Sequence, residues 1–418
     1  MSQLAERGES AWLAPRRAVT VFLAFALAYF LSTLIRAVTA TLSPVLNAEL
    51  SLQARDLGLL AGGYFLGFAL TQLPLGAWLD RFGPRRVILA FLTVAVVGCA
   101  AFASATSFAG LLTARVLTGM GVSACLMAPL TGYRRWLRPA DQLRANSWML
   151  MTGSLGMVAS TLPVQWLLPL IGWRGLFWGL AGLVALSMLV LLSGVPRWPS
   201  TGSSGDAGDV RGYADILRHP FFRMMLPIGF FNYAGMLAMQ TLWAGPWMVK
   251  VCGATPQQAA FGLFAINLTM LGCFWLWGLV NPALARRGLR AEQLIAGGLP
   301  LSFAALAAVV LLGPDAGWPL WALFCASSTF VSLSQPAVAM AMPAQAAGRA
   351  LSAYNLVIFA GVFVMQWAIG GLIDLLAWLG QDTVTSFRGA VAVFGLCGVA
   401  AYIVFLSGHR RLRLQAAG

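Results

Sequence analysis

The stretch Gly76-Ala77-Trp78-Leu79-Asp80-Arg81-Phe82-Gly83-Pro84-Arg85-Arg86 joins two long apolar segments of the chain. An apolar run from Val87 to Ala103 follows it directly, and similar runs extend from Val19 to Leu34 and from Leu176 to Leu192. Each run approaches the length of roughly 20 residues that an α-helix needs to cross the hydrocarbon core of a bilayer. The quoted stretch is therefore predicted to be a short polar connection between two membrane spans.

The composition extends this prediction to the whole chain. Of the 418 residues, 59% are hydrophobic and only 10% are charged, whereas soluble domains carry roughly a quarter charged residues. We therefore predict an all-α membrane protein with twelve transmembrane helices. The expected spans are 18–46, 56–79, 86–106, 108–136, 142–169, 174–194, 220–250, 257–284, 291–312, 317–343, 349–374 and 387–408.

The formal net charge of +14 would indicate nucleic-acid binding in a soluble protein, but the positions of the cations exclude nucleic acid as a partner. With the N-terminus inside the cell, most of the 27 basic residues fall in the N-terminus, the inner loops and the C-terminus. This asymmetry follows the positive-inside rule and predicts that both termini are cytoplasmic. The exceptions are Arg55, Arg174, Lys250 and Arg388 on the outer side and Arg36 and Arg115 within spans.

An internal repeat is visible as residue pairs that share one offset of 205 positions. The pairs occupy equivalent places between spans and indicate a duplicated six-helix unit. A stretch rich in Ser, Gly and Asp separates the halves. The expected domains are a six-helix bundle over 1–195, a cytoplasmic linker over 196–218 and a second bundle over 219–418. The pairs are Gly67 and Gly272, Arg81 and Arg286, Gly83 and Gly288, Arg85 and Arg290, Arg144 and Arg349, and Ser147 and Ser352.

Motifs of enzymes and of metal sites are missing from the sequence. The six cysteines are scattered and lack the paired spacing of a disulfide or metal framework. The glycine-rich turns lack the Gly-Lys-Ser/Thr ending of a nucleotide-binding loop. We expect neither an enzyme nor a bound cofactor. Lys250 is the single lysine among the 27 basic residues, a coding bias that indicates a bacterial genome and hence an inner membrane.

The stretch from Gly76 to Arg86 resembles the loop signature of the major facilitator superfamily, and the number of spans, the position of the loop and the repeat agree with it. The resemblance implies two pseudo-symmetric bundles that expose a central site to each side of the membrane in turn. It also implies a cytoplasmic gate. There, Asp80 is expected to face the positive N-terminal end of the eleventh helix near Ala350 and the cation of Arg134 or Arg135.

Other residues of this stretch have expected structural roles. Gly76 is expected to allow close helix packing, and Gly83 a tight turn. Arg81, Arg85 and Arg86 are expected to hold the loop at the cytoplasmic surface.

The fourth span carries a second pattern that is similar to one of this family, in which Arg115 is followed by Gly119-Met120-Gly121. We expect these glycines to pack closely against a neighbouring helix. The fifth span, by contrast, lacks the Gly-Pro-x-x-Gly-Gly stretch that many drug antiporters carry. This difference disfavours proton-driven drug efflux without excluding it.

Arg36 is the leading candidate for substrate binding, because a charge inside the bilayer costs a few kcal/mol and usually has a function. Ser32, Thr33 and Thr39 lie within one helical turn and give the region a polar face. Arg36 is therefore predicted to face the cavity and to attract an anionic group. The alternative is that it extends to the outer headgroups. Arg115 ranks second, since a structural pairing explains it equally well.

The resemblance places the first, fourth, seventh and tenth spans around the central cavity. The polar and aromatic residues of these spans and their neighbours describe a neutral, hydrogen-bonding cavity with one strong cation, although each one also fits an interhelical hydrogen bond. A helix break is expected at Gly245-Pro246. The candidates are Asn232, Tyr233, Gln240, Trp243, Asn267, Trp275, Ser328, Ser332, Gln335, Tyr354, Asn355 and Gln366.

Acids and histidines are absent from the middle of the predicted spans, although proton relays in transporters usually use them. Glu49, Asp56 and Asp374, near the outer surface, are weak candidates for that role. Facilitated diffusion, or a proton carried by the substrate itself, stays open.

These observations favour a secondary transporter, and a monomer, that carries a small organic or inorganic anion by rocker-switch alternating access. Soft-metal import of copper is an alternative, because methionines can bind copper and Met236, Met239 and Met270 lie in neighbouring spans. Multidrug efflux is another alternative. A further alternative is a transporter-like receptor or assembly factor, which would have the same fold but would not move a solute across the membrane. The expected partners are a small-molecule substrate and the lipid bilayer.

Overall fold

The computed structural model describes residues 12–197 and 210–417, and these residues form helices and short connections without a strand. The elements η1 and η2 are π-helical, and η3 and η4 are 3₁₀-helical. In chain order they are α2 (Pro15–Leu50), α3 (Ala54–Leu70), α4 (Gln72–Phe82), α5 (Pro84–Ser104), α6 (Phe108–Val122), α7 (Ala124–Trp136), α8 (Pro139–Ala159), α9 (Leu162–Gly194), α10 (Val210–Arg218), α11 (Pro220–Pro227), η1 (Ile228–Tyr233), α12 (Ala234–Ala238), η2 (Met239–Trp243), α13 (Ala244–Lys250), α14 (Pro256–Arg286), α15 (Ala291–Leu312), η3 (Gly313–Asp315), α16 (Trp318–Ser328), η4 (Thr329–Leu333), α17 (Ser334–Met340), α18 (Ala344–Trp378) and α19 (Thr383–Ala417).

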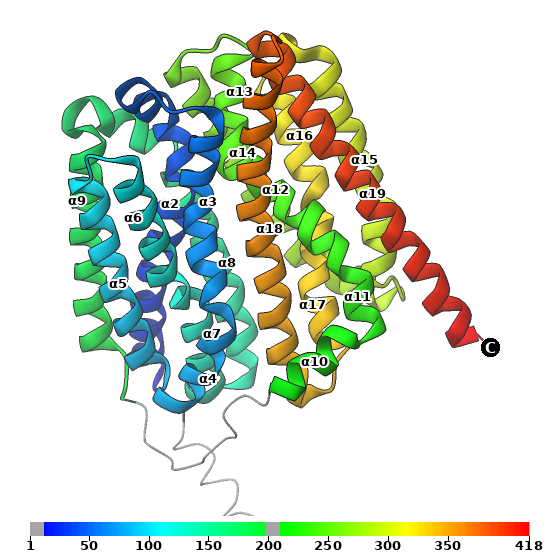
Figure 1. The fold of residues 1–418 in the computed structure, drawn as a ribbon. Helices are drawn as coiled ribbons and strands as arrows, with labels where there is room; N and C mark the ends of the chain where they lie inside the picture. The colour runs from blue at the N-terminus through cyan, green and yellow to red at the C-terminus, as the bar shows by residue number, and fades with distance from the viewer. Residues whose placement is uncertain (1–11, 198–209, 418) are drawn as a thin grey trace, which may run out of the picture.

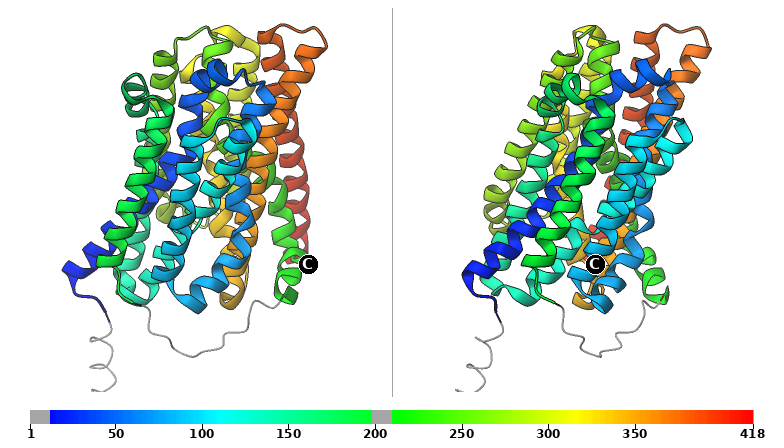
Figure 2. Two further views of the ribbon diagram at one scale, coloured as in Figure 1. Left: turned by 60° about the vertical axis from the view of Figure 1, so that its left-hand side comes forward. Right: turned by 90° about the vertical axis from the view of Figure 1, so that its left-hand side faces the viewer.

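Nine helices in this part of the chain are long and apolar enough to cross a membrane, and the bent pair of α3 and α4 brings the number to ten. Two further expected spans have a different form. The fifth, 142–169, is α8 and the first part of α9, which turns at Gly172 (φ 64°). The seventh, 220–250, is the segmented run from α11 to α13. The start of α2 and the end of α19 lie at the same end of the molecule (Figure 2), as an even number of crossings requires.

The seventh span shows where a prediction from sequence was wrong. A break was expected at Gly245-Pro246, but α13 is helical through both residues. The irregular turns lie earlier, in the π-helical segments η1 and η2. Proline lacks an N–H and its ring crowds the carbonyl four residues before it, here that of Leu242, so a widened turn at that place relieves the clash.

The helices pack in two groups that meet along α3 and α18. Figure 1 shows α3, in blue, beside α18, in dark orange, at the middle of the molecule. Helices α2, α3, α5, α6, α8 and α9 contact one another on one side, and α14, α15, α16, α18 and α19 on the other. A second contact between the groups joins α8 to α14.

The predicted linker 196–218 falls partly outside the described residues. Its last part, Val210–Arg218, is the helix α10, which contacts α11 and α18. The division into two bundles at this segment stays a prediction. The repeat does have a structural counterpart, because Gly83 and Gly288 both adopt a left-handed backbone, with φ of 75° and 77°. The tight turn expected at Gly83 is thus confirmed.

Two expectations about close glycine packing have opposite outcomes. A Cβ added at Gly119 would lie 1.9 Å from the carbonyl oxygen of Tyr64, and one at Gly121 would lie 2.2 Å from the nitrogen of Ala95. Close packing of the fourth span is therefore confirmed. At Gly76 a Cβ would meet no described atom within 4 Å. The packing expected at Gly76 is wrong for this conformation, because no neighbouring helix approaches α4 at that residue.

Candidate functional site

Arg36 lies in the interior of the molecule, where α2, α3 and α18 meet. Its guanidinium carbon is 5.5 Å from the ring centroid of Phe68 on α3 and 5.8 Å from that of Phe359 on α18. The two rings contact each other with centroids 4.3 Å apart. The head group of Arg36 therefore lies against the rings of two other helices. The side chain keeps partial exposure, so this position is not fully packed.

No carboxylate neutralises Arg36 within the described residues. The ion pairs there join Arg55 to Asp56, Arg144 to Asp141 and Arg174 to Glu49. The Nε atom of Arg36 is buried and has no hydrogen-bond partner in this part of the chain. A buried cation is costly unless it is paired or hydrogen-bonded. Arg36 therefore has capacity for an anion that the described part of the protein does not supply.

Phenol groups are the polar neighbours of Arg36. Tyr64, Tyr29 and Tyr233 all interact with it electrostatically. Tyr29 lies seven residues before Arg36 on α2, a spacing that puts both on one helical face. The Tyr64 hydroxyl donates to the carbonyl of Ser32 at 3.2 Å, and its oxygen is also a hydrogen-bonding partner of the Arg36 guanidinium. These hydroxyls give the site groups that can donate to, or accept from, a bound solute.

A hydrogen-bonded chain leads from this cluster into the second group of helices. The Tyr233 hydroxyl donates to Oε1 of Gln335 at 3.2 Å, and Nε2 of Gln335 donates to Oδ1 of Asn355 at 2.5 Å. Three predicted residues, from η1, α17 and α18, are thus brought together. They link the neighbourhood of Arg36 to helices far apart in the sequence.

Arg115 is fully buried, and its two terminal nitrogens bond to α2, whereas its Nε atom has no hydrogen-bond partner among the described residues. Its guanidinium donates to the carbonyl of Ile35 at 3.1 Å and to Oγ1 of Thr39 at 2.5 Å. It also lies 5.4 Å from the ring centroid of Tyr64. Because Ile35 directly precedes Arg36, Arg115 fixes the α2 segment that carries the candidate cation. This geometry matches the structural pairing that the sequence left open.

Several other predicted residues bond to neighbouring helices or to their own. The Thr33 hydroxyl donates to the carbonyls of Tyr29 and Phe30 on its own helix, and Thr33 packs at Gly156 of α8. Nε2 of Gln240 donates to Oδ1 of Asn267 at 2.9 Å, which joins η2 to α14. Gln240 and Asn267 therefore form an interhelical contact, whereas the hydroxyl of Thr33 is bonded within its own helix.

The remaining candidates are distributed through the core and the surface. Ser328 is buried, and the Ser332 hydroxyl donates to the carbonyl of Thr329 at 2.7 Å. The Tyr354 hydroxyl donates to the carbonyl of Met225 at 3.1 Å. Trp275 is exposed on the same face of α14 as Leu276 and Leu279, and so points away from the interior. Trp243 and the methionines Met236, Met239 and Met270 are buried in the apolar core.

The predicted gate is formed only in part in this structure. Asp80 is exposed at the end of α4, interacts electrostatically with Arg134, one of its two expected cations, and forms no ion pair with a described residue. Helix α4 contacts α18, but no hydrogen bond joins Asp80 to the start of α18 among the described residues. Of the loop arginines, Arg85 donates to the carbonyl of Leu192 at 2.6 Å. The guanidinium of Arg81 lies over Phe82, and Arg86 is exposed.

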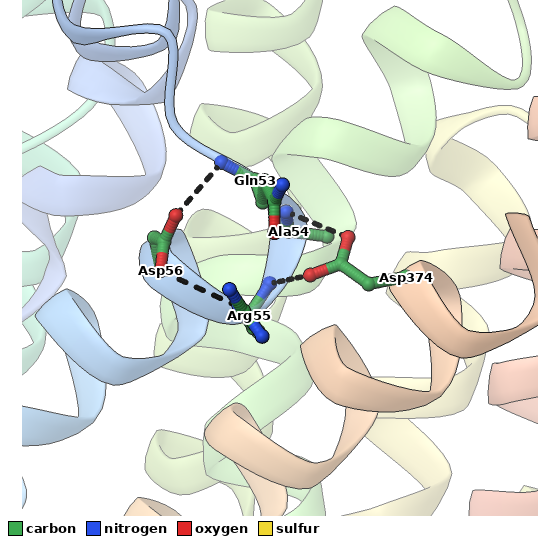
Figure 3. Close-up of polar contacts among 5 residues, drawn as sticks. All are labelled: Gln53, Ala54, Arg55, Asp56 and Asp374. Carbon is green, nitrogen blue, oxygen red and sulfur yellow. Dashed lines mark hydrogen bonds and ion pairs between the residues drawn. The ribbon is translucent and has the colours of Figure 1, made fainter. Parts of the chain in front are cut away.

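At the opposite end of the molecule, an acid of α18 caps α3 (Figure 3). Oδ1 of Asp374 accepts the backbone N–H of Ala54 at 3.0 Å, and Oδ2 accepts that of Arg55 at 2.8 Å. Asp56 accepts the N–H of Gln53 at 3.1 Å. Glu49 binds Arg174 and the indole N–H of Trp173. All three acids considered for proton coupling therefore have partners.

Sequence reasoning missed Phe68, Phe359 and the cap by Asp374. Phenylalanine in an apolar span is ordinary packing material, so its place beside Arg36 depends on the fold alone. For Asp374 a signal existed in its partner, since the capping box of Gln53 and Asp56 marks a helix start. Nothing in the sequence showed that an acid more than three hundred positions away would reach that start.

Comparisons with known proteins agree with this architecture. A family model described as Major Facilitator Superfamily matches residues 25–366. A bacterial homologue of the human lysosomal transporter Spinster, in an inward-facing and unoccupied conformation, superposes with a TM-score of 0.77 at 18% identity, over 95% of this chain and 98% of its own. A D-xylose-proton symporter superposes with a TM-score of 0.74 at 15% identity, over 93% and 97%.

Curated relatives match over shorter segments. The multidrug resistance protein MdtM of Salmonella typhimurium is 29% identical over 218 residues, which is 50% of this chain and 51% of the relative. The 4-hydroxybenzoate transporter PcaK of Acinetobacter baylyi is 22% identical over 276 residues, or 57% and 60%. The chain thus spans about half to three fifths of the length of these relatives.

Proposed function

The chain belongs to the Major Facilitator Superfamily, and from that premise we propose that it carries a small organic or inorganic anion across the bacterial inner membrane. The fold is an all-helical, multi-pass membrane fold of secondary transporters rather than of enzymes. In the proposal, the protein acts as a monomer with both termini in the cytoplasm. Arg36 is the residue that binds the anion, and rocking of the two bundles exposes it to each side in turn.

One observation supports this proposal above all others, namely that Arg36 is an interior cation without a carboxylate partner among the described residues. A charge in that place costs a few kcal/mol on insertion scales. A substrate anion offsets part of this cost when it binds, because charge-assisted hydrogen bonds are strong where water is scarce. The same reasoning disfavours a cationic substrate, which Arg36 would repel.

The alternatives have weaker support. Copper import would need methionine sulfurs that face a cavity, and Met236, Met239 and Met270 are almost fully buried among apolar neighbours. Drug efflux agrees with the relative MdtM, and transport of an aromatic acid agrees with the relative PcaK. Of these two, the aromatic acid is an anion and matches the charge of Arg36.

Uptake into proteoliposomes tests the proposal. Wild-type protein is expected to take up at least one of radiolabelled benzoate, lactate, nitrate or phosphate faster than protein-free liposomes at pH 8. Arg36→Ala should lose at least about 90% of that uptake, and Arg36→Lys should keep part of it, because the charge remains but the forked donors do not. Arg410→Ala, a change of an exposed arginine on α19, serves as the control. Full uptake by both Arg36 variants would contradict the role of Arg36.

A further inference from the structure

The surroundings of Arg36 restrict the anion further, and this inference rests on the proposed function. We propose that the substrate is an organic monocarboxylate with a flat, apolar body. The argument depends on two properties of the site, its total charge and the kind of side chains around the cation.

One guanidinium, that of Arg36, is available to bind a substrate directly. Arg115 brings a second positive charge to the ring of Tyr64, but both of its terminal nitrogens already donate to α2. The groups that interact with Arg36, Tyr29 and Tyr233 include no further Lys, Arg or His among the described residues. Phosphate or sulfate would bring close to two negative charges, of which only one could pair directly with a free guanidinium in a poorly hydrated interior. One guanidinium matches one carboxylate, which it binds through two parallel N–H donors.

The side chains around Arg36 are aromatic. Phe68 and Phe359 lie against the guanidinium, and Tyr64 stacks near Phe68 with ring centroids 6.2 Å apart. Tyr29 and Tyr233 complete the cluster. Rings of this kind favour a flat apolar body through stacking and edge contacts. Their hydroxyls can in addition bond to a polar substituent on that body.

The test compares monovalent anions with phosphate, which carries more charge, on the detergent-solubilised full chain. The melting temperature is measured with benzoate, cyclohexanecarboxylate, acetate, nitrate and phosphate at equal ionic strength, because a ligand of the folded state stabilises it in proportion to occupancy. Benzoate should raise the melting temperature most, cyclohexanecarboxylate less, and acetate and phosphate least. Phe359→Leu should remove the preference for benzoate over acetate, whereas Phe261→Leu, a change of an exposed ring on α14, should not.

The outcomes separate this inference from the proposed function. Stabilisation by nitrate or phosphate and not by benzoate would overturn the carboxylate class and leave anion transport standing. An equal response to benzoate and cyclohexanecarboxylate in wild type, unchanged in Phe359→Leu, would overturn the role of the rings. The absence of a response to every anion, together with no uptake in liposomes, would overturn the proposed function itself.

A second inference comes from an independent observation, the cap shown in Figure 3. We infer that Asp374 is a latch that holds the outer ends of the two helix groups together. Its carboxylate accepts two backbone N–H groups of α3, at Ala54 and Arg55, which lie at the positive end of that helix. Gly370, one turn earlier on α18, packs on the same residues, since a Cβ there would lie 2.4 Å from the carbonyl oxygen of Ala54. Opening this end requires both contacts to break.

Backbone hydrogen exchange at Ala54 and Arg55 measures directly whether the contact with Asp374 is formed. In the full-length wild type, the amides of Ala54 and Arg55 should exchange slowly, and Asp374→Ala should raise their exchange rate at least about tenfold without changing the segment around α5. Asp382→Ala is the matched control. Asp382 is an acid near the same end, and its carboxylate accepts the N–H of Thr385 in the first turn of α19 rather than an N–H of α3.

Two results would overturn the latch. One is unchanged exchange at Ala54 and Arg55 in Asp374→Ala. The other is a rise of similar size in every helix, which would show that Asp374 supports the fold as a whole rather than the contact between α3 and α18.

Discussion

The two ends of the contact between the helix groups differ in this structure. At the end that carries Asp374, the backbones of α3 and α18 touch, since a Cβ at Gly58 would lie 2.2 Å from the carbonyl oxygen of Gln366. At the end that carries Asp80, α4 bends by 46° from α3, and a Cβ at Gly76 would meet no described atom within 4 Å. The backbones of α3 and α18 are thus in close contact at one end, whereas α4, which also contacts α18, has open space at Gly76.

The difference between the two ends concerns two acids, Asp374 at one end and Asp80 at the other. Asp374, late in α18, caps the start of α3. Asp80, at the end of α4, is expected to face the start of α18, and no hydrogen bond or ion pair joins the two among the described residues. Asp374 thus caps a helix start in the other group, and the prediction for Asp80 is the equivalent contact at the opposite end. In an alternating-access cycle the two contacts would be formed in turn.

The largest effect is expected from filling the glycine contact at the closed end. Gly370→Leu would drive a side chain into the backbone of Ala54 and Arg55, and overpacking of this kind costs about 1–3 kcal/mol. Either the closed end separates or the protein melts earlier. Gly371→Leu is a neighbouring control, because a Cβ at Gly371 meets no described atom within 4 Å. Melting curves and hydrogen exchange at residues 54–60 measure the difference, and equal behaviour of the two variants would contradict the tight contact.

A smaller effect is expected from Asp80→Asn. Asp80 forms no ion pair with a described residue, so the melting temperature should change little. Uptake should fall about three- to tenfold, because a carboxylate at a helix start contributes about 0.5–2 kcal/mol to the state in which the contact forms. Asp141→Asn is the control, since Asp141 pairs only with Arg144 on its own exposed helix face. Unchanged uptake in Asp80→Asn would remove Asp80 from the cycle.

The smallest effect on stability is expected from Gly76→Ala. Alanine is favoured over glycine inside a helix by up to about 1 kcal/mol, and space is available at Gly76, so the melting temperature should stay equal or rise slightly. Gly121→Ala should lower it clearly, because its Cβ would lie 2.2 Å from the nitrogen of Ala95. A fall in Gly76→Ala as large as that in Gly121→Ala would show that the end carrying Asp80 is tightly packed in solution.

Much of the fold could be predicted from sequence because the bilayer imposes simple requirements. Span length and hydropathy located most of the helices, and the need for a left-handed turn explains Gly83. The structure of the seventh span was predicted less well. A proline indicates that a helix is disturbed, but the disturbance lies one turn before Pro246, in η2, and the helix continues through the proline itself.

The candidate site could be predicted only in part, because tertiary packing decides which side chains surround Arg36. Arg36 stands out in any apolar span because its charge is costly there. Thr33 shares its helix and its polarity, yet its hydroxyl bonds to Tyr29 and Phe30 and lies against α8. Phe359, far along the chain, contacts the guanidinium instead. Which side chains surround Arg36 follows from how α18 meets α3, and no local pattern in the sequence records that contact.

Calorimetric titration with benzoate tests the central claim, that one anion binds at Arg36, most directly. The wild-type chain is expected to bind one benzoate per molecule. Arg36→Gln should weaken binding about a hundredfold, because two charge-assisted hydrogen bonds are lost, while Arg410→Gln should bind as the wild type does. Equal affinity of Arg36→Gln and wild type, with an unchanged melting temperature, would contradict the account.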